Sequence, residues 1–221
     1  MPNLTNNLPK GFWYDSLDST QNEAKRLIQA GQIQGTAFVV ADHQTQGRGT
    51  HGREWISPEN AGIYLSVIHM PPPKETFEMT TLYTLSAGVA CIEALQLTTG
   101  IEARLKPVND IYVNGKKLGG ILVESELRQD GMTALITGIG INTHHVDRNL
   151  DIPISLEELL LPEAFLQFKS EALIEALVAK VCFWHGLVMT GNTGQVEKAW
   201  TQFCSGDTGL TEATILGLSP R

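Results

Sequence analysis

The sequence predicts an α+β fold, a mainly antiparallel mixed sheet with helices packed against it. Strand-like segments after residue 103 are joined by tight turns, at Asn114-Gly115 and at Asp130-Gly131. Tight turns join antiparallel neighbours, whereas parallel neighbours need a long crossover. Apolar residues recur at helical spacing both before and after this region. The chain has 221 residues, 42% of them hydrophobic, which is enough for one substantial domain.

The first third of the chain contains one helix-like and two strand-like segments. The stretch STQNEAKRLIQAG reads as a helix in which Thr20 and Glu23 form a capping box and Gly31 ends the helix. Its apolar face consists of Ala24, Leu27 and Ile28. Buried-type strands are expected at 36–41 and at 62–70. The second strand is ended by a run of prolines, which cannot donate ladder hydrogen bonds.

Another helix, the meander and a helical C-terminal part follow. The helix is predicted from the spacing of Leu82, Leu85, Val89 and Ile92. Strands are then expected in EARLK, DIYVNGKKLGGILVESEL and MTALITGIGIN, and a loop near residue 150. A long amphipathic helix is predicted from Leu173, Leu177, Val181, Trp184 and Val188, and a short helix surrounds Trp200.

Bulk composition narrows the function classes. The net charge of −8 argues against a general nucleic-acid binder, which usually carries a basic surface. The N-terminus lacks the apolar core of a signal peptide, and no stretch approaches the ~18 uninterrupted apolar residues of a membrane span. The three cysteines are widely spaced, so neither a disulfide framework nor a thiolate zinc site is expected. We therefore expect a cytoplasmic protein that binds neither DNA nor a membrane.

The stretch ADHQTQGRGTHGREWISP carries Gly47, Gly49 and Gly52 in a G-x-G-x-x-G pattern. A dinucleotide loop would need a helix opening at the third glycine, but a proline follows too soon. A P-loop would need lysine and then serine or threonine after Gly52, where this chain has Arg-Glu. Both nucleotide-binding folds are therefore disfavoured.

The same loop retains the features of an anion site. Its glycines let several backbone N–H groups point at one anion, and Arg48 and Arg53 add donors suited to carboxylate or phosphate. No acidic residue lies between Asp42 and Glu54, so no neighbour in sequence cancels that charge. For the loop taken alone, the alternative is a mobile surface turn.

Further glycines lie inside predicted strands. Gly119 and Gly120 are adjacent, and Gly138 and Gly140 alternate with apolar residues. Glycine in a strand costs about 0.5–1 kcal/mol and often marks the close approach of a ligand or another backbone. Lys106 ends a strand just before a turn. Singly these residues suggest bulges and a solvated lysine, but together they predict a sheet surface that admits something flat.

These segments resemble the biotin–protein ligases. DST at 18–20, QTQGRGTHGREWISP, LKPVNDIYVNGKKLGGILVE and GIGIN occur in the order and spacing of that family, from about residue 12 to 145 and more loosely to about 190. The resemblance implies a biotin/lipoate ligase-like catalytic domain and a two-step reaction. Biotin and ATP, the latter with Mg²⁺, form biotinyl-5′-adenylate, and a lysine of a biotin carboxyl carrier protein then attacks it.

The resemblance also implies roles for individual residues. Arg48 and Lys106 are the expected catalytic residues, with Lys106 bridging the biotin carboxylate and the α-phosphate. The residues expected to bind biotin are Ser19, Thr20, Gln21, Gln44, Gly47, Arg48, Lys106, Gly119, Gly120, Gly138 and Gly140. Those expected to bind ATP or the adenylate are Arg48, Gly49, Thr50, Arg53, Asn109 and Asn142. His144 and His145, adjacent on a strand, point to opposite faces, so no structural metal is expected.

The chain departs from the family pattern in places. The usual Lys-Trp-Pro-Asn-Asp reads Lys-Pro-Val-Asn-Asp at 106–110, and Thr50 stands where many members carry arginine, so we expect the adenylate to be held less firmly. Residues 1–190 are expected to form the catalytic domain. Residues 191–221 are expected to form a C-terminal helix and tail, too short for the family's SH3-like barrel. No helix-turn-helix precedes residue 12, so no repressor function is expected.

Two other functions remain open at this level. One is a lipoate or octanoate ligase or transferase of the same fold, and the other is a non-catalytic biotin-binding module. The expected oligomeric state is monomer or homodimer, because members of the family that the chain resembles dimerise by different surfaces or not at all. An exposed sheet edge is only weak evidence for self-association.

Overall fold

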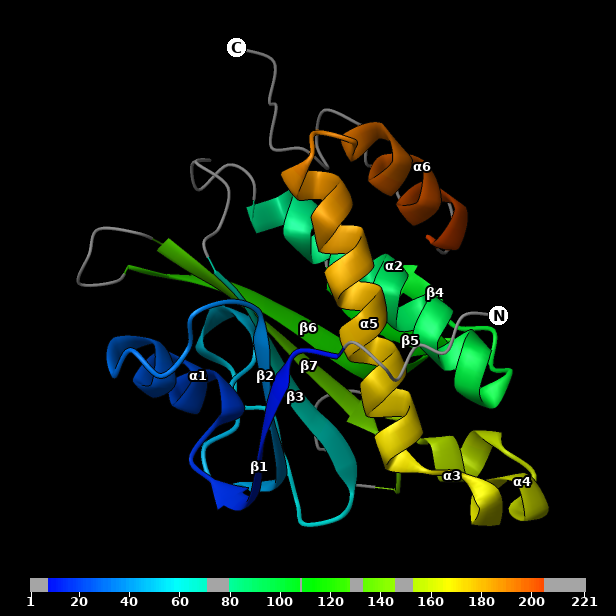
Figure 1. Cartoon of the computed structure of the whole chain (residues 1–221). Helices are drawn as coiled ribbons and strands as arrows, with labels where there is room; N and C mark the ends of the chain where they lie inside the picture. The colour runs from blue at the N-terminus through cyan, green and yellow to red at the C-terminus, as the bar shows by residue number, and fades with distance from the viewer. Residues whose placement is uncertain (1–7, 71–79, 108, 128–132, 146–152, 205–221) are drawn as a thin grey trace.

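The computed structural model of the chain describes residues 8–70, 80–107, 109–127, 133–145 and 153–204. Within them a seven-stranded sheet has the order β1-β2-β3-β7-β6-β5-β4 (Figure 1). Its strands are β1 (Lys10–Leu17), β2 (Ala37–Gln44), β3 (Gly62–His69), β4 (Arg104–Lys106), β5 (Asp110–Val113), β6 (Lys116–Leu127) and β7 (Thr133–Asn142). Neighbouring strands are antiparallel except β1 and β2, which run parallel. The predicted mainly antiparallel mixed sheet is confirmed.

Helices cover both faces of this sheet. They are α1 (Thr20–Gln29), α2 (Thr80–Thr99), α3 (Leu156–Leu159), α4 (Pro162–Gln167), α5 (Ser170–Met189) and α6 (Thr193–Phe203). α2 and α5 lie on one face with α6 beside them, and α1 lies on the opposite face (Figure 1). The predicted helices are therefore confirmed, and α3 and α4 are helices that the sequence did not predict. The loop expected near residue 150 lies outside the described residues.

The meander is built as the turn residues predict. Asn114 and Gly115 have positive φ angles of 51° and 75°, which is the type I′ geometry that matches the twist of a two-residue hairpin. β6 then pairs with β7 from Gly119↔Ile141 to Leu127↔Thr133. The predicted turn at 130–131 lies outside the described residues.

The start of α1 differs from the prediction by one residue. Ser19 is the N-cap, because it is extended and its side-chain oxygen accepts a hydrogen bond from the backbone N–H of Gln21. Thr20 is already helical, so the predicted Thr20–Glu23 capping box is wrong. The predicted end is confirmed, since Gly31 follows the helix with a φ of 66°.

β1 is a strand that the hydrophobic pattern did not predict. It pairs with β2 from Lys10↔Ala37 to Leu17↔Gln44, and its residues are exposed or half-buried. A strand at the edge of a sheet buries little on either face, so it leaves little alternation in the sequence.

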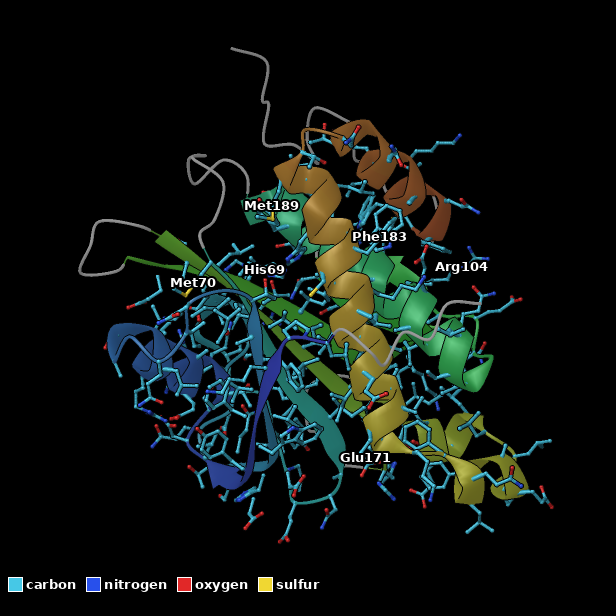
Figure 2. The ribbon with its side chains drawn as sticks, in the orientation of Figure 1. His69, Met70, Arg104, Glu171, Phe183 and Met189 are labelled. Atoms are coloured by element: carbon cyan, nitrogen blue, oxygen red, sulfur yellow. The ribbon has the colours of Figure 1, made fainter. Side chains whose placement is uncertain are left out.

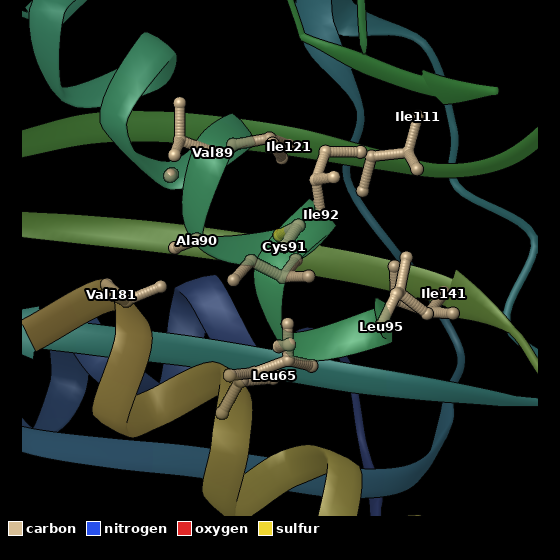
Figure 3. Close-up of a cluster of buried hydrophobic side chains, with 14 of the residues drawn as sticks. Leu65, Val89, Ala90, Cys91, Ile92, Leu95, Ile111, Ile121, Ile141 and Val181 are labelled. Carbon is tan, nitrogen blue, oxygen red and sulfur yellow. The ribbon is translucent and has the colours of Figure 1, made fainter. Parts of the chain in front are cut away.

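The larger hydrophobic core lies between the sheet and the helices α2, α5 and α6 (Figure 3). Strand residues such as Leu65 and Ile141 project into it and are fully buried. α6 adds Val196 and Trp200 to the same cluster. Among the described residues, α6 therefore packs into the same hydrophobic core as the elements before residue 190, where the domain boundary was expected.

α5 is long and apolar enough to cross a membrane, judged by length and composition alone. In the structure it is a core helix that packs along α2 and buries nine residues, including all five that predicted it. Phe183 and Met189 of this helix remain exposed (Figure 2). The three cysteines are free.

Candidate functional site

A cavity of about 660 Å³ opens on the α1 side of the sheet, a volume typical of small-ligand pockets. Its walls come from the start of α1, from β3, from the β5–β6–β7 meander and from residues 47–56, here called the glycine loop. The predicted site residues that line it are Ser19, Thr20, Gln21, Gln44, Arg48, Gly49, Thr50, Arg53, Asn109, Gly120, Gly138 and Gly140. Those that do not are Gly47, Lys106, Gly119 and Asn142.

The buried side chains of Ser19, Thr20, Gln21 and Gln44 form a polar wall of the cavity, which Ser57 and Ser66 support by hydrogen bonds. The backbone N–H and the hydroxyl of Thr20 both donate to Oε1 of Gln44, at 2.8 and 3.2 Å. Nε2 of Gln44 donates to Oγ of Ser57 at 2.8 Å, and Oγ of Ser66 donates to Oγ1 of Thr20 at 2.9 Å. None of these residues is more than 9% exposed. This buried wall, with both donors and acceptors, suits a ligand that carries a compact polar group.

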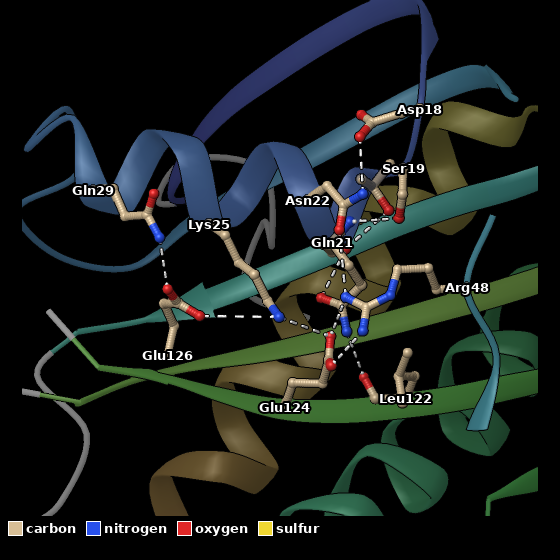
Figure 4. A network of polar contacts seen from close by, with 12 residues as sticks. Asp18, Ser19, Gln21, Asn22, Lys25, Gln29, Arg48, Leu122, Glu124 and Glu126 are labelled. Atoms are coloured by element: carbon tan, nitrogen blue, oxygen red, sulfur yellow. Dashed lines mark hydrogen bonds and ion pairs between the residues drawn. The ribbon is translucent and has the colours of Figure 1, made fainter. Parts of the chain in front are cut away.

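Gln21 ties this polar wall to the sheet. Its Nε2 donates to the carbonyl oxygen of Leu122 at 3.0 Å, and its Oε1 accepts from Ser66 at 3.4 Å (Figure 4). A Cβ atom at Gly138 would stand 3.1 Å from the same Nε2. Gly138 therefore makes room for the Gln21 amide.

Gly120 and Gly140 form a flat floor that the indole of Trp55 covers. A Cβ atom at Gly140 would lie 2.6 Å from Nε1 of Trp55, and one at Gly120 would lie 3.1 Å from the ring. Gly119 faces the other way, because adjacent strand residues alternate. A Cβ atom there would lie 2.7 Å from the end of Ile141 in the core. Gly119, expected at the biotin site, therefore faces the core and not the cavity.

The glycine loop holds its shape through its own backbone. Gly49 N–H donates to the carbonyl of Arg53 at 2.8 Å, and Trp55 N–H donates to the carbonyl of Gly47 at 2.9 Å. A Cβ atom at Gly47 would overlap the Trp55 carbonyl oxygen, so only glycine permits this approach. Gly47 thus shapes the loop instead of lining the cavity.

Arg48 is paired with an acid from another part of the chain. Its Nη2 and Nη1 lie 2.8 and 2.9 Å from the two carboxylate oxygens of Glu124 on β6. The sequence analysis noted only that no acid lies near Arg48 in sequence, whereas the fold supplies one from β6. Arg53 instead donates to Thr50 within the loop, from Nη2 to Oγ1 at 3.1 Å.

Two lysines lie near the opposite end of the cavity. Lys117 lines it, with Nζ 2.9 Å from Oδ1 of Asp110 and 5.7 Å from the centre of the Trp55 ring. The exposed Lys106 turns to Tyr112, with 3.4 Å between Nζ and Oη. Lys106 pairs with Asp110 across β4 and β5, so the two side chains leave the sheet on the same face. Lys106 therefore lies beside the cavity and not in its wall.

Lys117 was not predicted as a cavity residue because a β-bulge places its side chain on the other face of β6. Ile111 pairs with Gly119, but the next residue, Tyr112, pairs with Lys117. This shift brings Lys117 onto the same face as Gly120, which simple alternation from Gly119 would not do. The adjacent glycines are a signal for a bulge, but they do not indicate which residues it turns inward.

The two predicted asparagines hold backbone segments in place. Asn109 lines the cavity and donates from Nδ2 to the carbonyl of Ile121 at 3.0 Å. Asn142 lies outside the cavity wall, and its Nδ2 donates to the carbonyls of Ile154 and Lys117 at 3.1 and 3.3 Å. Asn142, expected on the ATP side, therefore does not line this cavity.

Histidines 144 and 145 have separate surroundings. The ring of His144 packs edge-on against Phe165, and Nδ1 of His145 lies 3.4 Å from a carboxylate oxygen of Glu158. In the part of the chain that the structure describes, no group of three or more histidine, cysteine, aspartate or glutamate residues is arranged to hold a metal ion.

Residues 13–142 match the Biotin/lipoate A/B protein ligase family. The chain is 38% identical over 150 residues to the bifunctional ligase/repressor BirA of Bacillus subtilis. The matched region covers 67% of this chain and 44% of that protein. The chain is 32% identical over 195 residues to the biotin–[acetyl-CoA-carboxylase] ligase of Paracoccus denitrificans, covering 83% and 76%.

The fold is similar to that of the biotin protein ligase from Aquifex aeolicus in complex with biotin and ATP. The TM-score is 0.72 at 28% identity, and the match covers 89% of this chain and 78% of that one. The chain thus spans less than half of the Bacillus relative and about three quarters of the Paracoccus and Aquifex proteins.

Proposed function

Because the chain belongs to the biotin/lipoate A/B protein ligase family, we propose that it is an ATP-dependent biotin–protein ligase. The supporting observation is a single cavity that joins a buried polar wall, a glycine floor and an arginine-bearing loop. The small substrates are biotin and ATP, the latter with its Mg²⁺. The acceptor is a lysine of a biotin carboxyl carrier protein.

The proposed reaction has two steps. A carboxylate oxygen of biotin attacks the α-phosphorus of ATP, the bond to the bridging oxygen of pyrophosphate breaks, and biotinyl-5′-adenylate forms. The neutral amine of the carrier lysine then attacks the acyl carbon, an amide forms with loss of a proton, and AMP leaves. The first step brings two anions together, so cationic groups and N–H donors held in place lower its barrier.

The buried polar wall is the proposed site of the ureido group of biotin. That group presents two N–H donors and one carbonyl acceptor, and Ser19, Thr20, Gln21 and Gln44 carry matching groups. These side chains now hydrogen-bond one another or nearby backbone, so biotin would replace part of that network. The polar wall favours biotin, which can exchange hydrogen bonds with it, over a purely aliphatic acid, which cannot.

The floor at Gly120 and Gly140, with Gly138 next to it, is the proposed support for the ring system of biotin. Trp55 covers this floor in contact distance, so ring binding there requires the indole to shift. Because Trp55 belongs to the glycine loop, binding at the floor would be linked to movement of the loop.

The charged groups around the cavity are proposed to stabilise the anions. Arg48 and the backbone of Gly49 serve the biotin carboxylate and α-phosphate, and Thr50, Arg53 and Asn109 serve the nucleotide. Lys106 is the proposed bridge between carboxyl and phosphate oxygens, reached by turning its four-carbon side chain from Tyr112 toward the cavity on the same sheet face. Lys117 is a second cation for that role.

Adenylation separates this function from its rivals. Exchange of labelled pyrophosphate into ATP is measured with biotin, lipoate or octanoate as the acid. Exchange with biotin alone supports the proposal, exchange with lipoate or octanoate assigns the chain to the rival ligases, and biotin binding without exchange assigns it to a binding module. Transfer to a carrier domain is then measured separately.

The two lysines are separated by parallel substitutions. Lys106→Ala and Lys117→Ala are compared for exchange rate and melting temperature. Loss of the bridging donor is expected to lower the rate by about 10²–10³ at an unchanged melting temperature. If Lys106→Ala keeps more than about a tenth of the wild-type rate while Lys117→Ala does not, the bridging role belongs to Lys117.

The proposed partner and location follow from the same premise. Recognition of the carrier would depend on local contacts, because the chain carries a net charge of −8 and acidic partners would not be steered to it at long range. A cytoplasmic location and a monomer or homodimer are proposed, with no role in DNA binding. Sedimentation with and without biotin and ATP tests the oligomeric state.

A further inference from the structure

Arg48 and Glu124 form a two-point contact between the glycine loop and the sheet. Both terminal nitrogens of the guanidinium bond both carboxylate oxygens, at 2.8 and 2.9 Å, across 76 positions in sequence (Figure 4). Neither side chain is more than 35% exposed. Paired bonds of this kind set the orientation of the guanidinium plane as well as its position.

Glu124 is well placed to fix the loop relative to the floor. It lies on β6 four residues after Gly120 and two after Leu122, so all three face the cavity side of the strand. Lys25 of α1 lies 3.6 Å from the same carboxylate. The position of the carboxylate is therefore set by the sheet and by α1, independently of its contact with the loop.

The backbone hydrogen bonds donated by Gly49 and Trp55 shape the loop, but these two bonds do not attach it to the sheet. The bonds at Gly49 and Trp55 both stay within residues 47–56. Trp55 touches the floor through apolar contact, which any ligand on the floor would disturb. The Arg48–Glu124 contact is directional and lies away from that floor, so it can persist while the indole moves.

We propose that Glu124 is a positioning residue that holds Arg48, and with it the glycine loop, in place for binding the anionic substrates. The proposal rests on the ligase function proposed above. A guanidinium has five N–H groups; Glu124 accepts from two of them and the amide oxygen of Asn22 from a third, at 3.4 Å. The remaining donors stay available for a carboxylate or phosphate, in an orientation that Glu124 has already set.

Glu126 provides a matched control. It lies two residues further along the same face of β6, accepts a hydrogen bond from Gln29 at 2.8 Å and lies 3.9 Å from Lys25. It shares the strand, the charge and the lysine with Glu124, and the contacts of Arg48 in this structure go to Glu124 and Asn22. A difference between Glu124→Gln and Glu126→Gln therefore reports the contact with Arg48.

Kinetics of biotin-dependent exchange provide the first test. Glu124→Gln is expected to raise the KM for biotin and to lower kcat/KM by about 10–100-fold, because misplacing a binding group by an ångström costs that much. Glu126→Gln is expected to stay within about twofold of wild type. In an Arg48→Ala background, Glu124→Gln is expected to change nothing further. Equal losses in both glutamine variants, or tighter binding in Glu124→Gln, would overturn the proposal.

Hydrogen exchange of the ligand-free protein provides a test that needs no activity. The amides of Gly49 and Trp55 are expected to exchange at least about fivefold faster in Glu124→Gln and at the wild-type rate in Glu126→Gln. If no acid supports pyrophosphate exchange in the wild-type protein, the proposed function fails while these amides still decide whether Glu124 holds the loop. If the protection of these amides is unchanged in Glu124→Gln, Glu124 does not hold the glycine loop in place, whatever the catalytic result.

Discussion

The two faces of the sheet are made by the same strands but differ in what they bury. On the face toward α2 and α5, β3 and β7 present Leu65, Val67, Ile139 and Ile141 to a continuous apolar core. On the face toward α1, β7 presents Gly138 and Gly140 to a cavity with a polar wall, and Ser66 of β3 supports that wall through its hydrogen bond to Thr20. α1 covers only part of this second face, with a smaller cluster around Leu27 and Ile68.

This difference indicates where stability and binding reside. Apolar burial supplies most of the folding free energy, so the α2/α5 face is expected to carry the stability of the domain. Glycines and buried polar groups add little stability and leave a concave surface, so the α1 face is free to specialise in ligand binding. The predictions below test this division, from the largest effect on stability to the smallest.

The largest expected effect is a cavity in the core face. Leu95 of α2 is fully buried there (Figure 3). Leu95→Ala is expected to lower the free energy of unfolding by about 2–5 kcal/mol, the usual cost of losing a buried leucine. Urea denaturation measures this, and biotin-dependent exchange well below the melting temperature should stay close to wild type. A loss of biotin affinity at full stability would contradict the division.

The pH dependence of stability should also originate on the core face. His69 of β3 and His185 of α5 are buried with their Nδ1 atoms 3.3 Å apart, next to the ring of Tyr83. Burial lowers the pKa of His69 to about 4, and burial together with the neighbouring His69 lowers the pKa of His185. Both folded-state pKa values lie below the ordinary value of about 6.5. At pH values below about 6.5 and above the folded-state pKa, the unfolded chain therefore binds more protons than the folded protein.

Stability is therefore expected to be complete above about pH 6.5 and to fall as the pH drops toward about 4, with His69 alone accounting for about 3 kcal/mol. Urea denaturation at a series of pH values measures the slope. His69→Leu should flatten it, whereas the exposed His51→Asn should leave it unchanged. An unaltered slope in His69→Leu would show that His69 does not contribute to the pH dependence of stability.

Adjacent glycines on β6 offer the sharpest comparison of the two faces. A Cβ atom at Gly119 would meet the backbone oxygen of Gly140 at 2.6 Å, whereas one at Gly120 would meet side chains, the Trp55 ring at 3.1 Å and Lys117 at 3.7 Å. Gly119→Ala is expected to cost about 1–3 kcal/mol of stability through overpacking. Gly120→Ala should cost less than about 1 kcal/mol and weaken biotin binding instead, because the Trp55 side chain can shift.

Thermal denaturation and calorimetric titration with biotin, applied to both variants, check this pair. Equal stability losses in the two variants would show that the faces are not independent at this point of β6.

The smallest expected effect lies in the polar contacts between α1 and the sheet. Lys25 reaches Glu124 and Glu126 at 3.6 and 3.9 Å, with a quarter of its side chain exposed. Lys25→Ala is expected to lower stability by less than about 1 kcal/mol, since ion pairs near the surface are worth little. A larger loss in urea denaturation would mean that α1 is held by charge more than by the apolar cluster beneath it.

Local signals predicted the elements that depend on local physics. The hairpin at Asn114-Gly115 forms because only such residues accept positive φ at both turn positions. The apolar faces of α2 and α5 were recognisable because helical spacing of buried residues is a property of the segment itself. β1 escaped prediction because its pairing comes from its neighbour β2 and not from its own pattern.

The candidate site divides in the same way. The glycines and arginines of residues 47–53 pointed to an anion-binding loop, since their chemistry is evident in the sequence. The partner of Arg48 was not evident, because Glu124 is 76 positions away. The inward turn of Lys117 depends on a bulge against β5, which is a property of two strands together.

The sequence by itself therefore determined the fold class, the meander and the glycine–arginine loop, because backbone preferences and apolar spacing act between residues close along the chain. Only the tertiary structure decided which glycine of the Gly119-Gly120 pair faces the cavity, which lysine lines it and which acid holds Arg48. Each of those outcomes depends on how strands and loops distant in sequence are placed side by side. Directional hydrogen bonds and the alternation of strand residues then fix which groups meet.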